Sequence, residues 1–94
     1  MTESKKLIKL ILNKLIRANI WGGKHIPLHY IKNGIPEYFR NSNHGRKEFE
    51  KAIKQMINNN WILMGKKKTG KGVDYHISLN PSKASEIRKL FEED

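Results

Sequence analysis

Basic and amide side chains recur at intervals of three and four residues in one stretch of the chain. They are His44, Lys47, Lys51, Lys54, Gln55 and Asn58. Groups of this kind can donate hydrogen bonds to phosphates and to the edges of bases in a nucleic-acid groove. A charged exposed face is also common on any amphipathic helix, and exposed amides are often simply solvated.

A second set of basic residues follows closely in the sequence. It comprises Lys66, Lys67, Lys68 and Lys71. Gly65, Gly70 and Gly72 lie among them and permit a turn, so we expect the lysines to share a flexible hairpin turn. Phosphates would neutralise their mutual repulsion, although lysines also protect hairpin edges from aggregation. Together the two sets would form two basic projections. This arrangement suits a domain that contacts a nucleic-acid groove and the phosphate backbone beside it.

The remaining polar residues do not form a recognisable catalytic or metal-binding pattern. The histidines, which are His25, His29, His44 and His76, share no ligand spacing with nearby carboxylates or thiols. There is no Ser-His-Asp set, no pair of catalytic carboxylates and no phosphate-binding glycine loop leading into a helix. The sequence therefore predicts no enzymatic activity, no metal site and no cofactor.

The length and the net charge of the chain also favour a binding protein over an enzyme. The 94 residues are enough for one domain over positions 1–94 with one modest core, which leaves little room for a deep substrate cleft. Lys and Arg outnumber Asp and Glu by 19 to 9, a formal net charge of +10 that favours a polyanionic partner, unless it serves only solubility.

The absence of cysteine excludes disulfides and thiolate zinc sites and is compatible with an intracellular compartment. The N-terminal residues resemble neither a signal peptide nor a membrane span. We expect a soluble, cytoplasmic protein that does not contact a membrane.

The first basic set falls on a predicted helix over residues 43–59. Its apolar positions, Phe49, Ala52, Ile53, Met56 and Ile57, keep a period of 3.6 residues. Asn41-Ser42-Asn43 offers N-cap residues, and Asn58-Asn59-Asn60 can end the helix because asparagine tolerates the left-handed conformation. The basic and amide residues lie opposite the apolar side, with Glu48 and Glu50 at the flanks.

The other elements surround this helix. The predicted order is a helix over 1–20, a short edge strand at 24–26, a broken helix over 27–40, a hairpin over 61–79 and a last helix over 81–93. Gly34-Ile35-Pro36 accounts for the break, because the residue before proline is pushed away from helical geometry. Val73, Tyr75, Ile77 and Leu79 alternate as the apolar face of a strand.

The first helix has a wider apolar arc than a single core contact needs. This arc either packs within the domain or faces a second subunit, and we assign Leu12, Ile16, Leu90 and Phe91 to a possible dimer or packing face. The aromatic residues that suit the core or its edge are Trp21, Trp61, Tyr30, Tyr38 and Phe39. The alternative, a stacking platform for single strands, has only Tyr30 and Tyr38 as candidates for reaching outward.

The order of elements resembles the winged helix-turn-helix family, particularly the small winged-helix proteins of archaea. The most characteristic stretch runs from Phe49 to Ile62, and it is similar to the family's recognition helix, its left-handed cap and the first strand of the wing. Asn60 stands where these proteins commonly carry glycine, and Trp61-Ile62 where they carry Leu-Ile or Leu-Val. The chain departs from the pattern at Gly34-Ile35-Pro36, which lengthens and breaks the second helix.

The resemblance implies a mainly helical α+β fold with a three-helix core, a short first strand, a β-hairpin wing and an extra C-terminal helix. It also implies binding of double-stranded DNA through the recognition helix and the basic wing, in a transcriptional regulator that could act as a homodimer. Two alternatives remain open. One is RNA binding through the same wing, and the other is a protein–protein adaptor that uses the apolar arc of the first helix.

Overall fold

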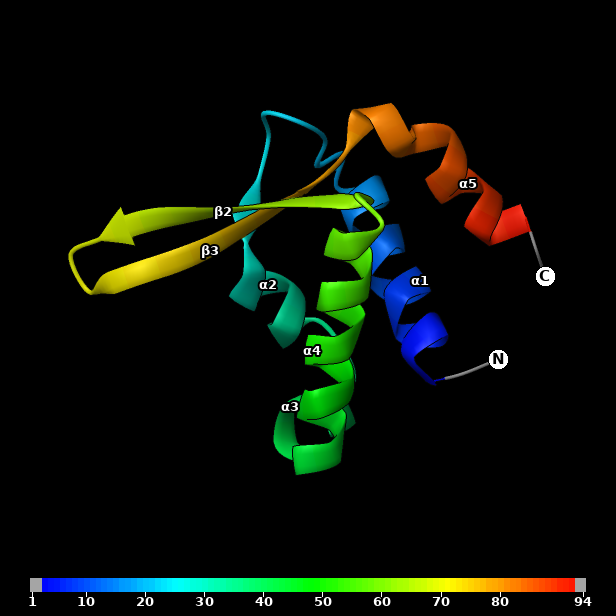
Figure 1. Ribbon diagram of the computed structural model, residues 1–94. Coiled ribbons are helices and arrows are strands. Elements are labelled where there is room, and N and C mark those ends of the chain that lie inside the picture. The colour runs from blue at the N-terminus through cyan, green and yellow to red at the C-terminus, as the bar shows by residue number, and fades with distance from the viewer. Residues whose placement is uncertain (1–2, 93–94) are drawn as a thin grey trace.

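Helices and a small antiparallel sheet share one core in the computed structural model, which describes residues 3–92. The fold is α+β and mainly helical, as expected (Figure 1). The helices are α1 (Glu3–Arg17), α2 (Leu28–Asn33), α3 (Tyr38–Asn41), α4 (Asn43–Asn58) and α5 (Ala84–Glu92), the last preceded by a 3₁₀ turn at Pro81–Lys83. The strands are β1 (Ile26–Pro27), β2 (Ile62–Thr69) and β3 (Gly72–Leu79). Residues 1, 2, 93 and 94 lie outside the described part of the chain.

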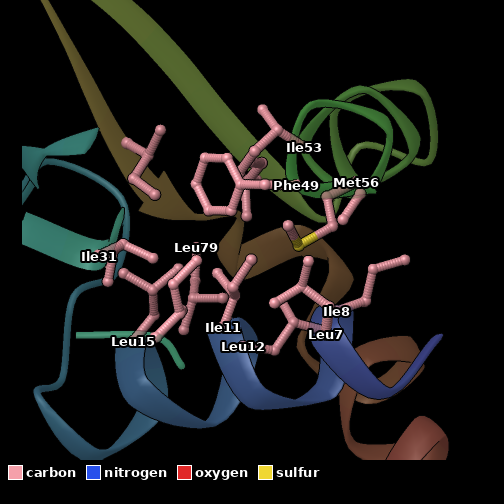
Figure 2. Packing of buried hydrophobic residues seen from close by; sticks show 14 of the residues in the cluster. Leu7, Ile8, Ile11, Leu12, Leu15, Ile31, Phe49, Ile53, Met56 and Leu79 are labelled. Carbon is pink, nitrogen blue, oxygen red and sulfur yellow. The ribbon is translucent and has the colours of Figure 1, made fainter. Parts of the chain in front are cut away.

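The core is centred on α1, whose apolar side chains contact α4, β3 and α5. Figure 2 shows Ile11, Leu12 and Leu15 of α1 in one cluster with Met56 of α4 and Leu79 of β3. Leu7 and Ile8 belong to the same cluster. The apolar arc of α1 is wide because three elements cover it, so contacts within one chain account for most of it.

The two long helices that border this core end in the same way. Asn19 and Asn60 both adopt the left-handed conformation, with φ of 57° and 60°. The amide of Ile20 donates to the carbonyl of Leu15 (3.0 Å), and the amide of Trp61 donates to that of Met56 (2.9 Å). These are the bonds of the Schellman motif, which satisfies carbonyls left without partners at a helix end. The sequence predicted this role for the asparagines after α4 and missed it at Asn19, because the predicted first helix continued to residue 20.

We expect Asn60→Ala to lower the free energy of unfolding by about 1 kcal/mol, because an alanine Cβ makes the left-handed conformation costly. Urea unfolding followed by circular dichroism measures this change. Asn60→Gly is the matched control, because glycine adopts a positive φ without that cost and should retain stability. Equal loss in both variants would mean that the asparagine side chain, and not the backbone conformation, is what matters.

The sheet has the order β1-β3-β2, and all its pairs are antiparallel. The first strand is shifted from its predicted position at 24–26, because Ile26 and Pro27 are the residues that pair with Ile77 and His76. Pro27 fits this edge strand, where a missing N–H costs no hydrogen bond within the sheet. It is also the N-cap of α2 instead of its first residue.

The hairpin is more regular than the sequence suggested. Its turn is only Gly70-Lys71, and the side-chain oxygen of Thr69 closes it by accepting from the amide of Lys71 (3.3 Å) and donating to the carbonyl of Gly72 (3.3 Å). Lys66, Lys67 and Lys68 therefore lie in β2 and not in a flexible turn, which corrects the prediction. They pair in register with Tyr75, Asp74 and Val73, and this backbone pairing extends the strand despite the repulsion between lysines.

The predicted apolar face of β3 is buried only near the base of the hairpin. Ile77 and Leu79 are fully buried, whereas Val73 and Tyr75 are 53% and 43% exposed. Strands of eight residues span about 26 Å, so their outer halves extend past the helices, as Figure 1 shows. The alternating apolar residues of β3 are thus part of the core at the base of the hairpin and part of the surface toward its tip.

The broken second helix is present as α2 and α3, separated by Gly34 to Glu37. Its second half meets α4 at a tight turn. Ser42 caps α4 by accepting a hydrogen bond from the amide of Gly45 (2.8 Å), and its hydroxyl donates to the carbonyl of Tyr38 (2.9 Å). The same serine therefore satisfies one donor of α4 and one acceptor of α3, which fixes the angle between them.

After the hairpin the chain turns back along the helices. The side chain of Asn80 accepts from the amide of Ser82 (3.2 Å), which starts the 3₁₀ turn, and the α-helix itself begins three residues after Pro81. The indole Nε1 of Trp61 donates to Glu86 of α5 (3.0 Å). Within residues 3–92, no helix combines the length and apolar character that crossing a membrane requires.

Candidate nucleic-acid interface

The exposed face of α4 carries three lysines on successive turns. Lys47, Lys51 and Lys54 are all exposed, and with His44, Glu48 and Glu50 they line a shallow surface hollow. At a rise of 1.5 Å per residue, Lys47 and Lys54 stand about 10 Å apart along the helix axis. The face is long enough to contact more than one phosphate.

Two acidic residues flank this face, as the helical projection predicted. Glu48 is largely covered, and its carboxylate lies 4.0 Å from Nε2 of His44, one turn earlier. Glu50 is exposed and lies on the side of α4 that faces the hairpin. The acids thus border the row of lysines and do not interrupt it.

A groove of about 440 Å³ separates α4 from the inner face of the hairpin. Its lining is Leu28, Phe49, Glu50, Ile53, Lys54, Ile57, Met64 and Tyr75. Lys54 belongs to the α4 side of the groove and Tyr75 to the hairpin side. On the hairpin, Nζ of Lys66 lies 5.9 Å from the centroid of the Tyr75 ring, within the range of a cation–π contact. Lys54 of the first basic set therefore lines this groove, and Lys66 of the second set lies beside it, against Tyr75.

The lysines of the hairpin divide between its two faces. Side chains alternate along a strand, so Lys66 and Lys68 share the face of Met64, which lines the groove. Lys67 lies on the opposite face, directly across from Asp74. Lys71 is in the turn at the tip. Only part of the predicted cluster thus points toward α4.

The two amides and the histidine of the predicted helix set lie apart from the groove. Gln55 lines a separate hollow with residues of α1, Trp61 and Leu90, on the other flank of α4. Asn58 is exposed in the last turn, and His44 is exposed in the first turn beside the ring of Tyr38. Of the predicted helix set, Lys54 alone lines the groove, whereas the candidate base-reading amides lie on the other flank and at the end of α4.

The predicted dimer or packing residues have different environments. Leu12 is fully buried within the domain, where it serves the core. Ile16 and Leu90 are half-buried against the core, and Phe91 is 39% exposed. Of these four, only the last three retain surface that a second chain could contact.

Sequence patterns missed two features of the surface. Tyr75 was placed on an apolar strand face, and only the length of the strands relative to the helices reveals that it is exposed. Tyr30 and Tyr38, which we predicted in the core or at its edge, are 62% and 45% exposed, because they lie on the outer sides of the short helices α2 and α3. The second missed feature is a contact between His25 and His76, which are 51 positions apart in the sequence. No local spacing could indicate it.

The chain matches no protein-family model, no curated protein and no solved structure. Its function must therefore be inferred from its own residues.

Proposed function

We propose that this chain is a winged helix-turn-helix protein that binds double-stranded DNA, with α4 as the recognition helix and the β2–β3 hairpin as the wing, and that it acts as a transcriptional regulator. The observation that carries the proposal is the shared groove: Lys54 of α4 and the Lys66–Tyr75 pair of the hairpin flank it from opposite sides.

The local architecture supports this proposal. A tight junction between α3 and α4, made by Ser42 and Gly45, precedes a helix that passes directly into a two-stranded hairpin. This follows the pattern that the resemblance led us to expect, including the short first strand beside the hairpin. The likeness concerns architecture, and the choice of ligand rests on the charges.

Dimensions also support a duplex as the ligand. A helix with its side chains is 10–12 Å across and the major groove of B-DNA is about 12 Å wide, so α4 can lie in it with Lys47, Lys51 and Lys54 toward the DNA. The hairpin extends about 26 Å from its base. Its tip can therefore reach the phosphate backbone beyond the groove that holds α4.

The arrangement favours contacts with the backbone over contacts with bases. Lys54 is the one basic side chain in the groove lining, beside Glu50 and apolar residues, and Lys66 lies against Tyr75 on the other wall. Lysines bind phosphates as point charges, whereas Gln55 lies on the other flank of α4. We therefore expect an affinity that depends strongly on salt and weakly on sequence.

Titration of the protein with a fluorescent 20-base-pair duplex tests the proposal. Fluorescence anisotropy at several salt concentrations should give a dissociation constant that rises linearly with salt on logarithmic axes, with a slope near 0.9 for each phosphate contacted. An excess of unrelated duplex measures sequence preference, and a structured RNA hairpin of equal charge serves as the comparison. Lack of binding to the duplex at low salt, or a clear preference for the RNA, would refute duplex DNA as the ligand.

A further inference from the structure

A pair of histidines meets on the sheet face that points away from α4. Nδ1 of His25 lies 2.8 Å from Nδ1 of His76, and the rings meet edge to face with centroids 4.8 Å apart. His25 precedes β1, and His76 lies within β3. The pair lines a hollow of about 400 Å³ together with Gly22, residues 63–67 of β2 and Ser78.

The backbone on either side of His25 is fixed to β3. On one side, the amide of Leu79 donates to the carbonyl of Ile20 (2.8 Å), and the amide of Gly22 donates to the carbonyl of Leu79 (2.9 Å). On the other side, Ile26 and Pro27 pair with Ile77 and His76. Only residues 23–25 lie between these anchors, so the fold itself sets the position of His25 opposite His76.

We propose that His25 and His76 form a binding site for a transition-metal ion that prefers imidazole, such as Ni²⁺, Cu²⁺ or Zn²⁺. Two ligand nitrogens at 2.0–2.1 Å from a tetrahedral ion are about 3.3 Å apart, and the narrower angle between neighbouring ligands of an octahedral ion places them about 2.9 Å apart. The observed separation of 2.8 Å is within about half an ångström of either. The Nδ1 atoms must therefore move slightly apart to admit an ion. Because His25 is exposed at the end of a short loop, this increase in separation requires only a small movement.

The surroundings determine which ions the site accepts. Among the described residues, no three His, Cys, Asp or Glu side chains are grouped closely enough to hold an ion together, so the pair supplies two ligands and water completes the shell. Lys67 nearby and the net charge of +10 oppose a cation that binds by charge alone. Mg²⁺ and Ca²⁺ prefer oxygen ligands and gain nothing from two imidazoles, whereas coordinate bonds to nitrogen hold the softer ions.

Further along β3, Asp74 forms a second pair with His29 of α2. Nδ1 of His29 lies 3.9 Å from a carboxylate oxygen of Asp74, and Asp74 is two positions from His76 on the same face of β3. This pair stands beside the proposed site without completing it. Three of the four histidines of the chain thus lie in β3 or beside it, where sequence spacing predicted no metal site.

Calorimetric titration of the untagged protein with NiCl₂ tests the site. We expect one ion per chain, and a melting temperature about 10 °C higher when the free ion is in hundredfold excess over its dissociation constant. MgCl₂ should give no binding. His25→Ala and His76→Ala should each weaken Ni²⁺ binding by tenfold or more, since losing even an indirect partner of a metal costs that much.

His44→Ala is the matched control, because His44 is an exposed histidine on α4 and should leave Ni²⁺ binding unchanged. His25→Asn provides a second test, because asparagine keeps a polar side chain at this exposed position while removing the imidazole. Absence of Ni²⁺ binding, or equal affinity in the His25 variants and the wild type, would refute the site. The pair faces away from α4, so these outcomes are independent of whether the protein binds DNA.

Discussion

Replacing Lys47, Lys51 and Lys54 together with glutamine should weaken binding to duplex DNA by about 500-fold at about 0.1 M monovalent salt. Each phosphate contact contributes about 0.9 to the slope of affinity against salt on logarithmic axes, so three contacts contribute about 2.7. If the variant and the wild type bind equally at about 1 M salt, this difference in slope lowers the affinity of the variant by nearly three orders of magnitude at about 0.1 M. Anisotropy titrations of the variant at several salt concentrations measure both the affinity and the slope.

The control for this variant removes the same charge elsewhere. Arg17, Arg88 and Lys89 are exposed at the end of α1 and on α5, and Figure 1 shows α5 on the side of the molecule opposite to the hairpin. Changing these three to glutamine lowers the net charge equally and should leave the salt slope almost unchanged. Equal losses in the two variants would show that net charge alone drives binding and would contradict a localised interface.

The helix that carries the candidate site could be predicted from local sequence because its determinants are local. Period-3.6 apolar residues, an N-cap serine and terminal asparagines all act within a few positions, and α4 starts and ends within one residue of the predicted bounds. The break at Gly34-Ile35-Pro36 was predictable for the same reason, since proline acts on its immediate neighbour.

The division of the hairpin lysines was not predictable in the same way. The three glycines suggested a long loop over residues 65–72, but cross-strand pairing, a long-range interaction, ordered all but two of its residues into β2 and β3. Once Lys66 to Lys68 are in a strand, alternation sends neighbours to opposite faces. The number of positive charges could be read from the sequence, but the hairpin face on which each lysine lies could not.

Exposure of Tyr75 and the contact between His25 and His76 have a common origin. Both depend on how far the hairpin extends past the helices and on what packs along its free edge, which no residue near them in sequence determines. The role of Gly45 also depends on residues that are packed against it by the fold. Its place inside a helix looks unfavourable by propensity, and only the approach of α3 explains it.

Gly45→Ala should lower the free energy of unfolding by about 3 kcal/mol, at the upper end of the cost of overpacking. A Cβ at this position would overlap the carbonyl oxygen of Tyr38 and lie 2.8 Å from the Cα of Phe39. Both are backbone atoms, so α3 must move away from α4, and the bridge made by Ser42 must lengthen. The better helix propensity of alanine, about 1 kcal/mol, is too small to offset this clash.

Thermal unfolding followed by circular dichroism measures the effect, which should appear as a melting temperature about 15 °C lower in a domain of this size. Gly65→Ala is the matched control, because a Cβ there would meet no atom within 4 Å, and its stability should change by about 0.5 kcal/mol at most. A Gly45→Ala variant as stable as the control would mean that α3 can shift freely. The junction would then not fix the angle at which α4 presents its lysines, and the case for a rigid DNA-binding surface would lose its structural basis.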